Sequence, residues 1–193
     1  MLSKRTFPAL MLIALIALAV SACGGSDSGE TTAEGPTIDP ATLQACQLFT
    51  VEDAIGFNGG KRVSTMSSTL EEASGGNHLV CTYNAGTRAR PRLLGLDIRP
   101  AKSPRAAARQ LESSRGFLTR LAGGEIQEVP GIGDKAVWAG GDIQQLHVLR
   151  GNLVLVISAQ TDNAPRSLYI AKLASKRVLE RLEPAQGEQK QPS

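Results

Sequence analysis

Residues 143–160 read IQQLHVLRGNLVLVISAQ, and this stretch decides the fold class. Two runs rich in aliphatic side chains flank Gly151-Asn152, a pair that tolerates the positive φ angles of a tight turn. The stretch therefore predicts two antiparallel strands, at 143–150 and 152–160. The letters LVLVI in the second run are apolar on both faces of a strand, which predicts a central position in a sheet.

More strand patterns precede this hairpin, and Gly-rich or Pro-containing breaks separate them. They occupy residues 62–66, 79–84, 92–99, 125–129 and 135–139. In the second of them, Leu79, Cys81 and Tyr83 alternate with Val80 and Thr82. Side chains two residues apart point to one face of a strand, so we expect Cys81 on the core face with Leu79 and Tyr83.

Three helix patterns divide these strands. Thr50 caps a short helix at 50–55 that has two acidic residues in its first turn. Ser103-Pro104 supplies the cap and the first-turn proline of a long helix that ends at Leu121, and a last helix is predicted at 165–182. Helical spacing predicts the core-facing residues Ala107, Leu111, Ser114, Leu118 and Leu121 in the first long helix, and Leu168, Ala171, Ser175, Val178, Leu179 and Leu182 in the second.

The order of elements fixes the expected architecture. The chain has 193 residues, of which 41% are hydrophobic and 20% charged, so it suits one ordinary domain and excludes a wholly disordered protein. Hairpins replace a strict alternation of strand and helix. We therefore expect an α+β fold, in which a mostly antiparallel sheet of six to seven strands is packed by two long helices and one short N-terminal helix.

The N-terminus has the three parts of a secretory signal. Lys4 and Arg5 precede an unbroken apolar run at 9–20, which is too short to span a membrane, because a spanning helix needs about 20 apolar residues. Residues 20–23, Val-Ser-Ala-Cys, resemble the lipobox of bacterial lipoproteins. That resemblance implies a diacylglycerol on Cys23, usually with an N-acyl chain such as palmitate. The alternative is a conventional signal in which this cysteine is incidental.

The cleavage site divides the chain into four parts. We expect a signal peptide at 1–22, the lipidated cysteine with a flexible linker at 23–42, a single domain at 43–184 and a disordered tail at 185–193. The linker is rich in Gly, Ser, Thr, Pro and acidic residues, so it cannot bury enough surface to fold. Gly rather than Asp follows the cysteine, which predicts the outer membrane in a diderm host and the plasma membrane in a monoderm.

Cys46 and Cys81 remain once Cys23 is assigned to lipid. Exported proteins meet an oxidising compartment, so this even pair predicts a disulfide, and two free thiols are the alternative. The bond would close a loop of about 36 residues and contribute about 4 kcal/mol in the chain-entropy model. The chain has no Cys-x-x-Cys and only two histidines, so its sequence does not favour a zinc site.

The basic residues are clustered rather than numerous. The chain carries 21 Lys and Arg against 18 Asp and Glu, and removal of the signal peptide leaves it nearly neutral, which does not favour nucleic acid as a partner. Arginine binds phosphate and carboxylate bidentately, so the basic stretch at 88–120 suggests a face for anionic headgroups or envelope polymers. A solvated helix face is the other interpretation. The candidate anion-binding residues are Arg88, Arg90, Arg92, Arg105 and Arg109.

Three motifs resemble a group of small bacterial lipoproteins with domains of unknown function. They are Cys46-Gln47-Leu48-Phe49-Thr50, Cys81-Thr82-Tyr83, and VPGIGDKAVW at 129–138. Some members of that group are similar to the PsbP-type α-β-α sandwich, and others to extracytoplasmic sensor domains of bacterial receptor kinases. The resemblance implies a Cys46–Cys81 pair and a binding or accessory role, and it supplies no catalytic residues.

The motifs of common hydrolases are absent from the sequence. It has no Gly-x-Ser-x-Gly, His-Glu-x-x-His or Ser-x-x-Lys. Gly131-x-Gly133-Asp134 precedes a predicted strand rather than a helix, so it predicts a structural turn and not a phosphate loop. We expect His147 at the surface or in a satisfied cross-strand contact, and His78 in a loop before the strand of Cys81.

These patterns together predict a lipid-anchored protein of the bacterial cell envelope, on the extracytoplasmic side of a membrane. Its domain is expected to be non-enzymatic, to bind a small ligand, lipid, polymer or partner protein, and to need no cofactor. One alternative is an accessory subunit that docks on a membrane complex, and a third is an extracytoplasmic hydrolase.

Overall fold

The computed structural model describes residues 35–67, 70–73, 76–123 and 126–183. The predicted signal peptide, Cys23, most of the predicted linker and the predicted tail lie outside these residues. Among the helices that are described, none is both long and apolar enough to cross a membrane.

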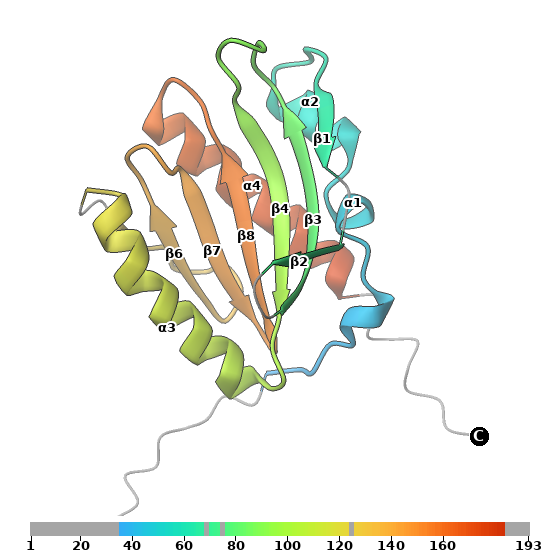
Figure 1. Ribbon diagram of the computed structural model, residues 1–193, viewed down its shortest axis with the longest axis vertical. Coiled ribbons are helices and arrows are strands. Elements are labelled where there is room, and N and C mark those ends of the chain that lie inside the picture. Colours follow the sequence, from blue (N-terminus) through green and yellow to red (C-terminus); the bar gives the residue numbers. More distant parts are fainter. Residues whose placement is uncertain (1–34, 68–69, 74–75, 124–125, 184–193) are drawn as a thin grey trace, which may run out of the picture. The chain divides into compact units, whose positions relative to one another are not determined.

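One antiparallel sheet organises the domain (Figure 1). Its strands pair in the order β1-β3-β4-β8-β7-β6-β5, and β2 pairs with β3 beyond the end of β1. β8 lies in the middle of this order and is buried along almost its whole length, which confirms the predicted central strand. The strands are β1 Ser64–Ser67, β2 Leu70–Ala73, β3 Gly76–Asn84, β4 Leu93–Pro100, β5 Ile126–Glu128, β6 Lys135–Ala139, β7 Gln145–Arg150 and β8 Leu153–Ala159.

The α+β fold class is confirmed. Each strand predicted from the sequence is present, with ends that shift by up to three residues. β2 is an addition to the prediction. Its sequence, Leu70-Glu71-Glu72-Ala73, has no β-branched or aromatic side chain, so its pairing with β3 leaves no signal in the sequence.

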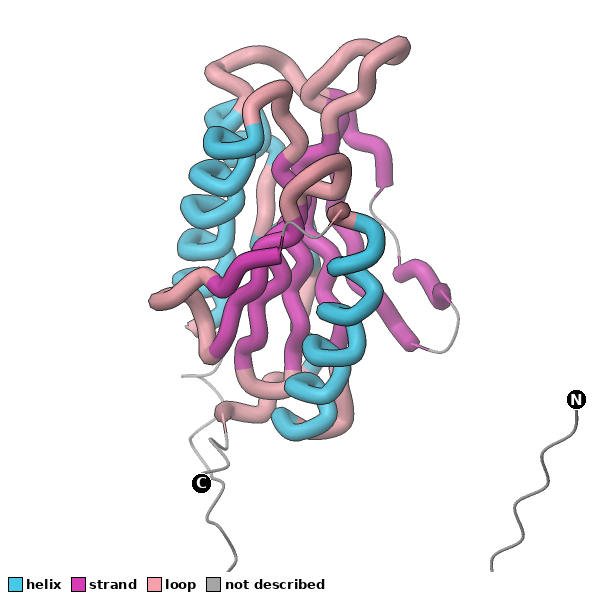
Figure 2. The backbone as a smooth tube through the Cα atoms, turned by 90° about the vertical axis from the view of Figure 1, so that its left-hand side faces the viewer, coloured by secondary structure: helices cyan, strands magenta, loops and turns pink. Residues whose placement is uncertain are grey.

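Helices cover both faces of the sheet, as the side view shows (Figure 2). α3, Pro104–Leu121, packs on β6, β7 and β8 from one face, and α4, Ala164–Leu182, packs on β7 and β8 from the other. The short helices α1, Ala45–Leu48, and α2, Val51–Phe57, precede β1, and α1 contacts α4. α3 starts as predicted, with Ser103 as its polar cap and a proline in the first turn. α4 starts one residue before the predicted position, and Asn163, which the sequence analysis did not identify, is its cap.

The larger part of the core lies between the sheet and α4. Its fully buried members include Leu146, Leu155 and Val178. A smaller cluster lies under α3 and contains Ala107 and Leu111. On the α4 side, the predicted core residues Ala171, Ser175, Val178 and Leu182 are buried, while Leu168 and Leu179 are partly buried.

One core-facing position of α3 was predicted wrongly. Leu121 is 53% exposed, and Ala122 is buried in its place beside Leu118 and Ala139. The reason is the helical angle: Ala122 lies four residues after Leu118 and is rotated by about 40° from it, whereas Leu121 is rotated by about 60° in the opposite direction.

Residues that precede the predicted domain boundary at 43 also pack on the domain. The Ile38 side chain is only 4% exposed, and its backbone N–H donates to Asn152 Oδ1 at 2.7 Å. Asn152 Nδ2 donates in return to the Ile38 carbonyl at 3.0 Å. Residues 35–42, which the composition assigned to the flexible linker, therefore belong to the folded part.

The Gly131–Asp134 segment is the structural turn that its sequence predicts. Gly131 and Gly133 have φ angles of 74° and 58°, and a Cβ on Gly133 would lie 2.5 Å from the Leu149 carbonyl oxygen. Asp134 Oδ2 accepts a hydrogen bond from the Gly151 N–H at 2.7 Å, so the carboxylate ties this turn to the β7–β8 turn.

Candidate functional site

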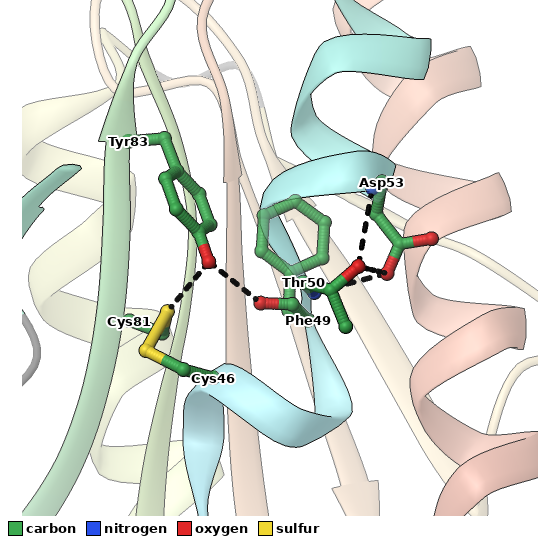
Figure 3. Close-up of a disulfide and its surroundings, with 6 residues drawn as sticks. All are labelled: Cys46, Phe49, Thr50, Asp53, Cys81 and Tyr83. Atoms are coloured by element: carbon green, nitrogen blue, oxygen red, sulfur yellow. Dashed lines mark hydrogen bonds between the residues drawn. A yellow bond between two sulfur atoms is a disulfide. The ribbon is translucent and has the colours of Figure 1, made fainter. Parts of the chain in front are cut away.

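The predicted disulfide between Cys46 and Cys81 is present (Figure 3). It joins α1 to β3, and Cys81 is fully buried on the core face with Tyr83, as the alternation in β3 predicts. The Tyr83 hydroxyl oxygen lies 3.2 Å from Cys81 Sγ and donates a hydrogen bond to the Phe49 carbonyl at 3.3 Å. Burial, and after it the charges of Glu52 and Asp53, raise the pKa of Tyr83, so the phenol stays protonated.

Asp53 connects α2 to α4. It completes a capping box with Thr50 in the first turn of α2, and its carboxylate accepts hydrogen bonds from Arg177 at 2.9 Å and from Arg181. Burial opposes the charge on Asp53, but the hydrogen bonds from Arg181 and the Thr50 N–H, with the charge of Arg181, outweigh it and lower the pKa. Arg177 also stacks over Phe57, with 4.9 Å between Cζ and the ring centroid.

These contacts fix the end of α2 beside a pocket of about 180 Å³. Antiparallel pairing explains why distant segments meet at this pocket. The end of β3, the start of β4 and the end of β8 all lie at the same end of the sheet. The segment before β1 and the link from β8 to α4 therefore reach this end of the sheet as well.

Basic and neutral polar side chains dominate the pocket lining. The cations are Lys61, Arg92 and Arg166, and the one carboxylate is that of Asp162. The other lining residues are the polar Asn58, Gln160, Thr161 and Asn163, and the apolar Phe57, Ala85 and Leu94. The charged lining side chains give a net positive charge, which suits an anion.

The pocket cations are available to a ligand. Arg92 Nη1 lies 3.2 Å from Asp162 Oδ2, but these side chains are 42% and 86% exposed, so the ion pair is weak. Within the described part of the chain, the side chains of Lys61 and Arg166 have no ion-pair partner. An anion in the pocket would therefore displace one weak contact and no strong one.

Hydrogen bonds hold the walls of the pocket in place. Asn84 Oδ1 accepts from the backbone N–H groups of Gly86 at 2.8 Å and Arg92 at 3.1 Å, which orders the β3–β4 loop. On the other wall, Gln144 Oε1 accepts from the Thr161 N–H at 2.9 Å and from the Ser167 hydroxyl at 2.7 Å. Such bracing lowers the entropy that a ligand must overcome.

The structure separates the arginines that the sequence grouped together. Arg92 lines the pocket, and Arg88 and Arg90 are exposed in the adjoining β3–β4 loop. Arg105 and Arg109 are exposed on α3, which begins beyond the far end of β4. The length of β4 is about 26 Å at roughly 3.3 Å per residue, so the two groups do not form one face.

Lys61 and Arg166 were missed by the sequence reasoning. Neither lies in the basic stretch, but both lie next to elements that antiparallel pairing brings to the same end of the sheet. The order in which the strands pair was therefore the information needed to predict Lys61 and Arg166 as pocket residues.

No family model, curated protein or solved structure matches this chain.

His147 contradicts the expectation of a surface or hydrogen-bonded histidine. It is 2% exposed, and within the described residues neither ring nitrogen has a hydrogen-bond partner. It lies between Val137 and Val156 in register, on the sheet face that α3 covers. Burial, and after it the charge of Arg99, lower the pKa of His147 to about 4, so the ring is neutral near pH 7.

His78 lies in β3, because the strand begins earlier than predicted. Its Nδ1 is 3.5 Å from Asp97 Oδ1, and Arg99 Nε donates to Asp97 Oδ2 at 2.8 Å. Neither histidine hydrogen-bonds to a hydroxyl or thiol group in the described ranges. Among these residues there is also no cluster of three metal-binding side chains.

Proposed function

We propose that this protein is a lipid-anchored, extracytoplasmic binding protein whose domain takes a compact anionic group in the pocket beside Arg92. The observation that carries this proposal is the convergence of Lys61, Arg92 and Arg166 on one ordered pocket with a single carboxylate. We propose no catalytic step, and the function is binding.

The size of the pocket favours a small ligand group. Pockets for drug-sized molecules measure about 300–1,000 Å³. At about 180 Å³, this pocket suits a phosphate or carboxylate group with a short substituent. Arg92 and Arg166 each present the planar fork that binds such oxygens bidentately, and Lys61 adds a point charge. Phe57 and Leu94 give the group an apolar surface to rest on.

The N-terminal sequence supports the proposed location. The basic start, the short apolar run and the lipobox-like residues 20–23 are features of lipoprotein precursors. A diacylglycerol with a further acyl chain on Cys23 would make membrane attachment stable. The Cys46–Cys81 disulfide suits an oxidising extracytoplasmic compartment. The lipoproteins of unknown function that the chain resembles would have the same placement.

Substitution of the pocket arginines tests the proposal. We expect Arg92→Gln and Arg166→Gln each to weaken binding of glycerol 3-phosphate about tenfold, because each removes one charge-assisted contact. Isothermal titration calorimetry on residues 24–193 measures this, and Arg105→Gln and Arg109→Gln on α3 are matched controls that should bind normally. Equal losses in both sets, or no binding by the unaltered protein, would contradict the pocket assignment.

A further inference from the structure

The outer face of α4 carries an exposed pair of apolar side chains. Tyr169 is 63% exposed and Leu173 is 37% exposed. They lie four residues apart, so they are neighbours on the helix surface. The opposite side of the helix, with Ile170, Ala174 and Val178, is buried against the rest of the domain. Tyr169 and Leu173 therefore do not contribute to the packing of α4 on the sheet.

Three cationic side chains lie next to this apolar pair on α4. Arg166, Lys172 and Lys176 flank Tyr169 and Leu173 on the outward side of α4. No ion pair involves any of these three side chains in the described ranges, whereas Arg177 and Arg181 are bound to Asp53. One exposed carboxylate, Glu180, lies on the same side of α4 closer to its C-terminus, so the three cations still give this face a net positive charge. An aromatic and an aliphatic side chain beside unpaired cations are typical of a surface that lies on an anionic membrane.

This surface is continuous with the pocket. Arg166 lines the pocket and also lies on the first turn of α4, three residues before Tyr169. Residues three apart are neighbours on a helix. A membrane in contact with Tyr169 would therefore place its headgroups next to Arg166 and the pocket mouth.

We infer that the outer face of α4 docks on an anionic bilayer and that the pocket receives the phosphate of a phospholipid headgroup there. This inference rests on the proposed anion-binding function. Tyrosine favours the headgroup region because its ring is apolar and its hydroxyl is polar, and Leu173 adds apolar area. Lys172 and Lys176 are attracted to the negative surface without a fixed partner.

The proposed lipid anchor permits this orientation. Gly35, the first described residue, packs against Gly151 at the start of β8, whereas the pocket lies beyond the end of β8. β8 is about 23 Å long at roughly 3.3 Å per residue. The chain from Cys23 to Gly35 can extend to at most about 43 Å, so it does not prevent contact of α4 with the same membrane.

Vesicle binding tests the inference. The probe protein is residues 24–193, which contain the complete sheet, its helices and the disulfide, and which lack the apolar signal that would itself insert into lipid. We compare its sedimentation with vesicles of pure phosphatidylcholine and with equimolar phosphatidylcholine and phosphatidylglycerol. The variants are Tyr169→Ser/Leu173→Ser on α4 and, as a matched control, Phe117→Ser/Leu121→Ser, an equally spaced exposed pair on α3 at the other face of the sheet.

We expect binding to the anionic vesicles only. The α4 double variant should bind them about tenfold more weakly, and the α3 control should bind as the unaltered protein does. Thermal unfolding checks that all variants are folded. Unchanged vesicle affinity of the α4 variant, equal losses in both variants, or equal binding to neutral vesicles would overturn the inference.

Titration with free glycerol 3-phosphate distinguishes this failure from failure of the proposed function. The α4 double variant should bind the free compound normally, because Tyr169 and Leu173 do not line the pocket. Binding of the free compound without any binding to anionic vesicles would overturn the membrane inference and leave the anion pocket standing. If the unaltered protein bound neither free glycerol 3-phosphate nor anionic vesicles, both proposals would be overturned.

Discussion

A single imidazole beneath α3 is a source of acid sensitivity in this domain. His147 is buried with both ring nitrogens unpaired in the described structure, so a proton on it would have no hydrogen-bond acceptor there. The unfolded chain binds a proton near the ordinary pKa of 6.5, whereas the native pKa is about 4. Between these values the unfolded state holds more protons than the native state, so stability falls as the pH falls.

We predict that the free energy of unfolding decreases by about 2 kcal/mol between pH 7 and pH 5 on account of His147. His147→Leu should remove this contribution, because leucine does not titrate. At pH 7 the variant should be as stable as the unaltered protein or more stable, since no buried polar group is left unpaired. Urea unfolding at both pH values measures the difference. A pH dependence that is the same in both proteins would contradict the assignment.

The sequence could not place His147 at this depth. Alternation puts Gln145, His147 and Leu149 on one face of β7, but it does not say whether a helix covers that face. The covering helix, α3, comes from residues 104–121, and its position depends on the pairing order of the whole sheet. Local patterns predict the direction of a side chain, and tertiary packing decides its exposure.

At the scale of elements, Gln144 braces the link that forms one wall of the pocket. Its φ angle is 50°, and it is the only described residue other than glycine with a positive φ. This conformation costs about 1 kcal/mol for a residue with a Cβ. Its side chain accepts hydrogen bonds from Thr161 and Ser167, on either side of the α4 cap. The strained backbone therefore positions Gln144 Oε1 to accept the hydrogen bonds that hold this wall of the pocket.

Two substitutions of Gln144 distinguish the cost of its backbone conformation from the contribution of its side-chain hydrogen bonds. Gln144→Ala keeps the backbone strain and loses the two hydrogen bonds, so we expect it to lower the free energy of unfolding by about 1 kcal/mol. Gln144→Gly loses the same bonds but relieves the strain, so it should be more stable than the alanine variant by about 1 kcal/mol. Urea denaturation compares them. Equal stabilities, or a less stable glycine variant, would show that the backbone at 144 is not strained.

Helices and strands were predicted correctly where a hydrophobic pattern was bounded by a cap, a proline or a turn residue. A polar cap and a first-turn proline located the start of α3, and the Gly151-Asn152 turn located the central hairpin. The candidate site was predicted only in part, because a linear cluster of arginines does not show which ends of strands coincide. Arg92 was included in the prediction, but its pocket neighbours Lys61 and Arg166 come from other parts of the chain.

At the scale of the whole molecule, the N-terminal segment decides where the folded domain begins. Composition predicted a boundary at residue 43, because residues 24–42 have few apolar side chains. One of those few, Ile38, is buried, and its backbone forms a pair of hydrogen bonds with the side chain of Asn152. A third hydrogen bond joins Asn152 Nδ2 to the Ala101 carbonyl at 3.3 Å. One buried amide thus joins the segment to the β7–β8 turn and to the end of β4.

Truncation tests this boundary. Chains of residues 24–193 and 35–193 should have the same free energy of unfolding, whereas a chain of residues 43–193 should be less stable by roughly 2 kcal/mol. Loss of Ile38 burial costs about 1.5–3 kcal/mol, and loss of the two hydrogen bonds between Ile38 and Asn152 costs about 1–3 kcal/mol. The entropy regained by the deleted residues offsets part of the sum. Asn152→Ala should destabilise the chain of residues 24–193 strongly and the 43–193 chain much less, because the latter lacks Ile38. Urea denaturation of the three chains, each with and without the substitution, measures both effects, and equal stability of all three would return the domain boundary to residue 43.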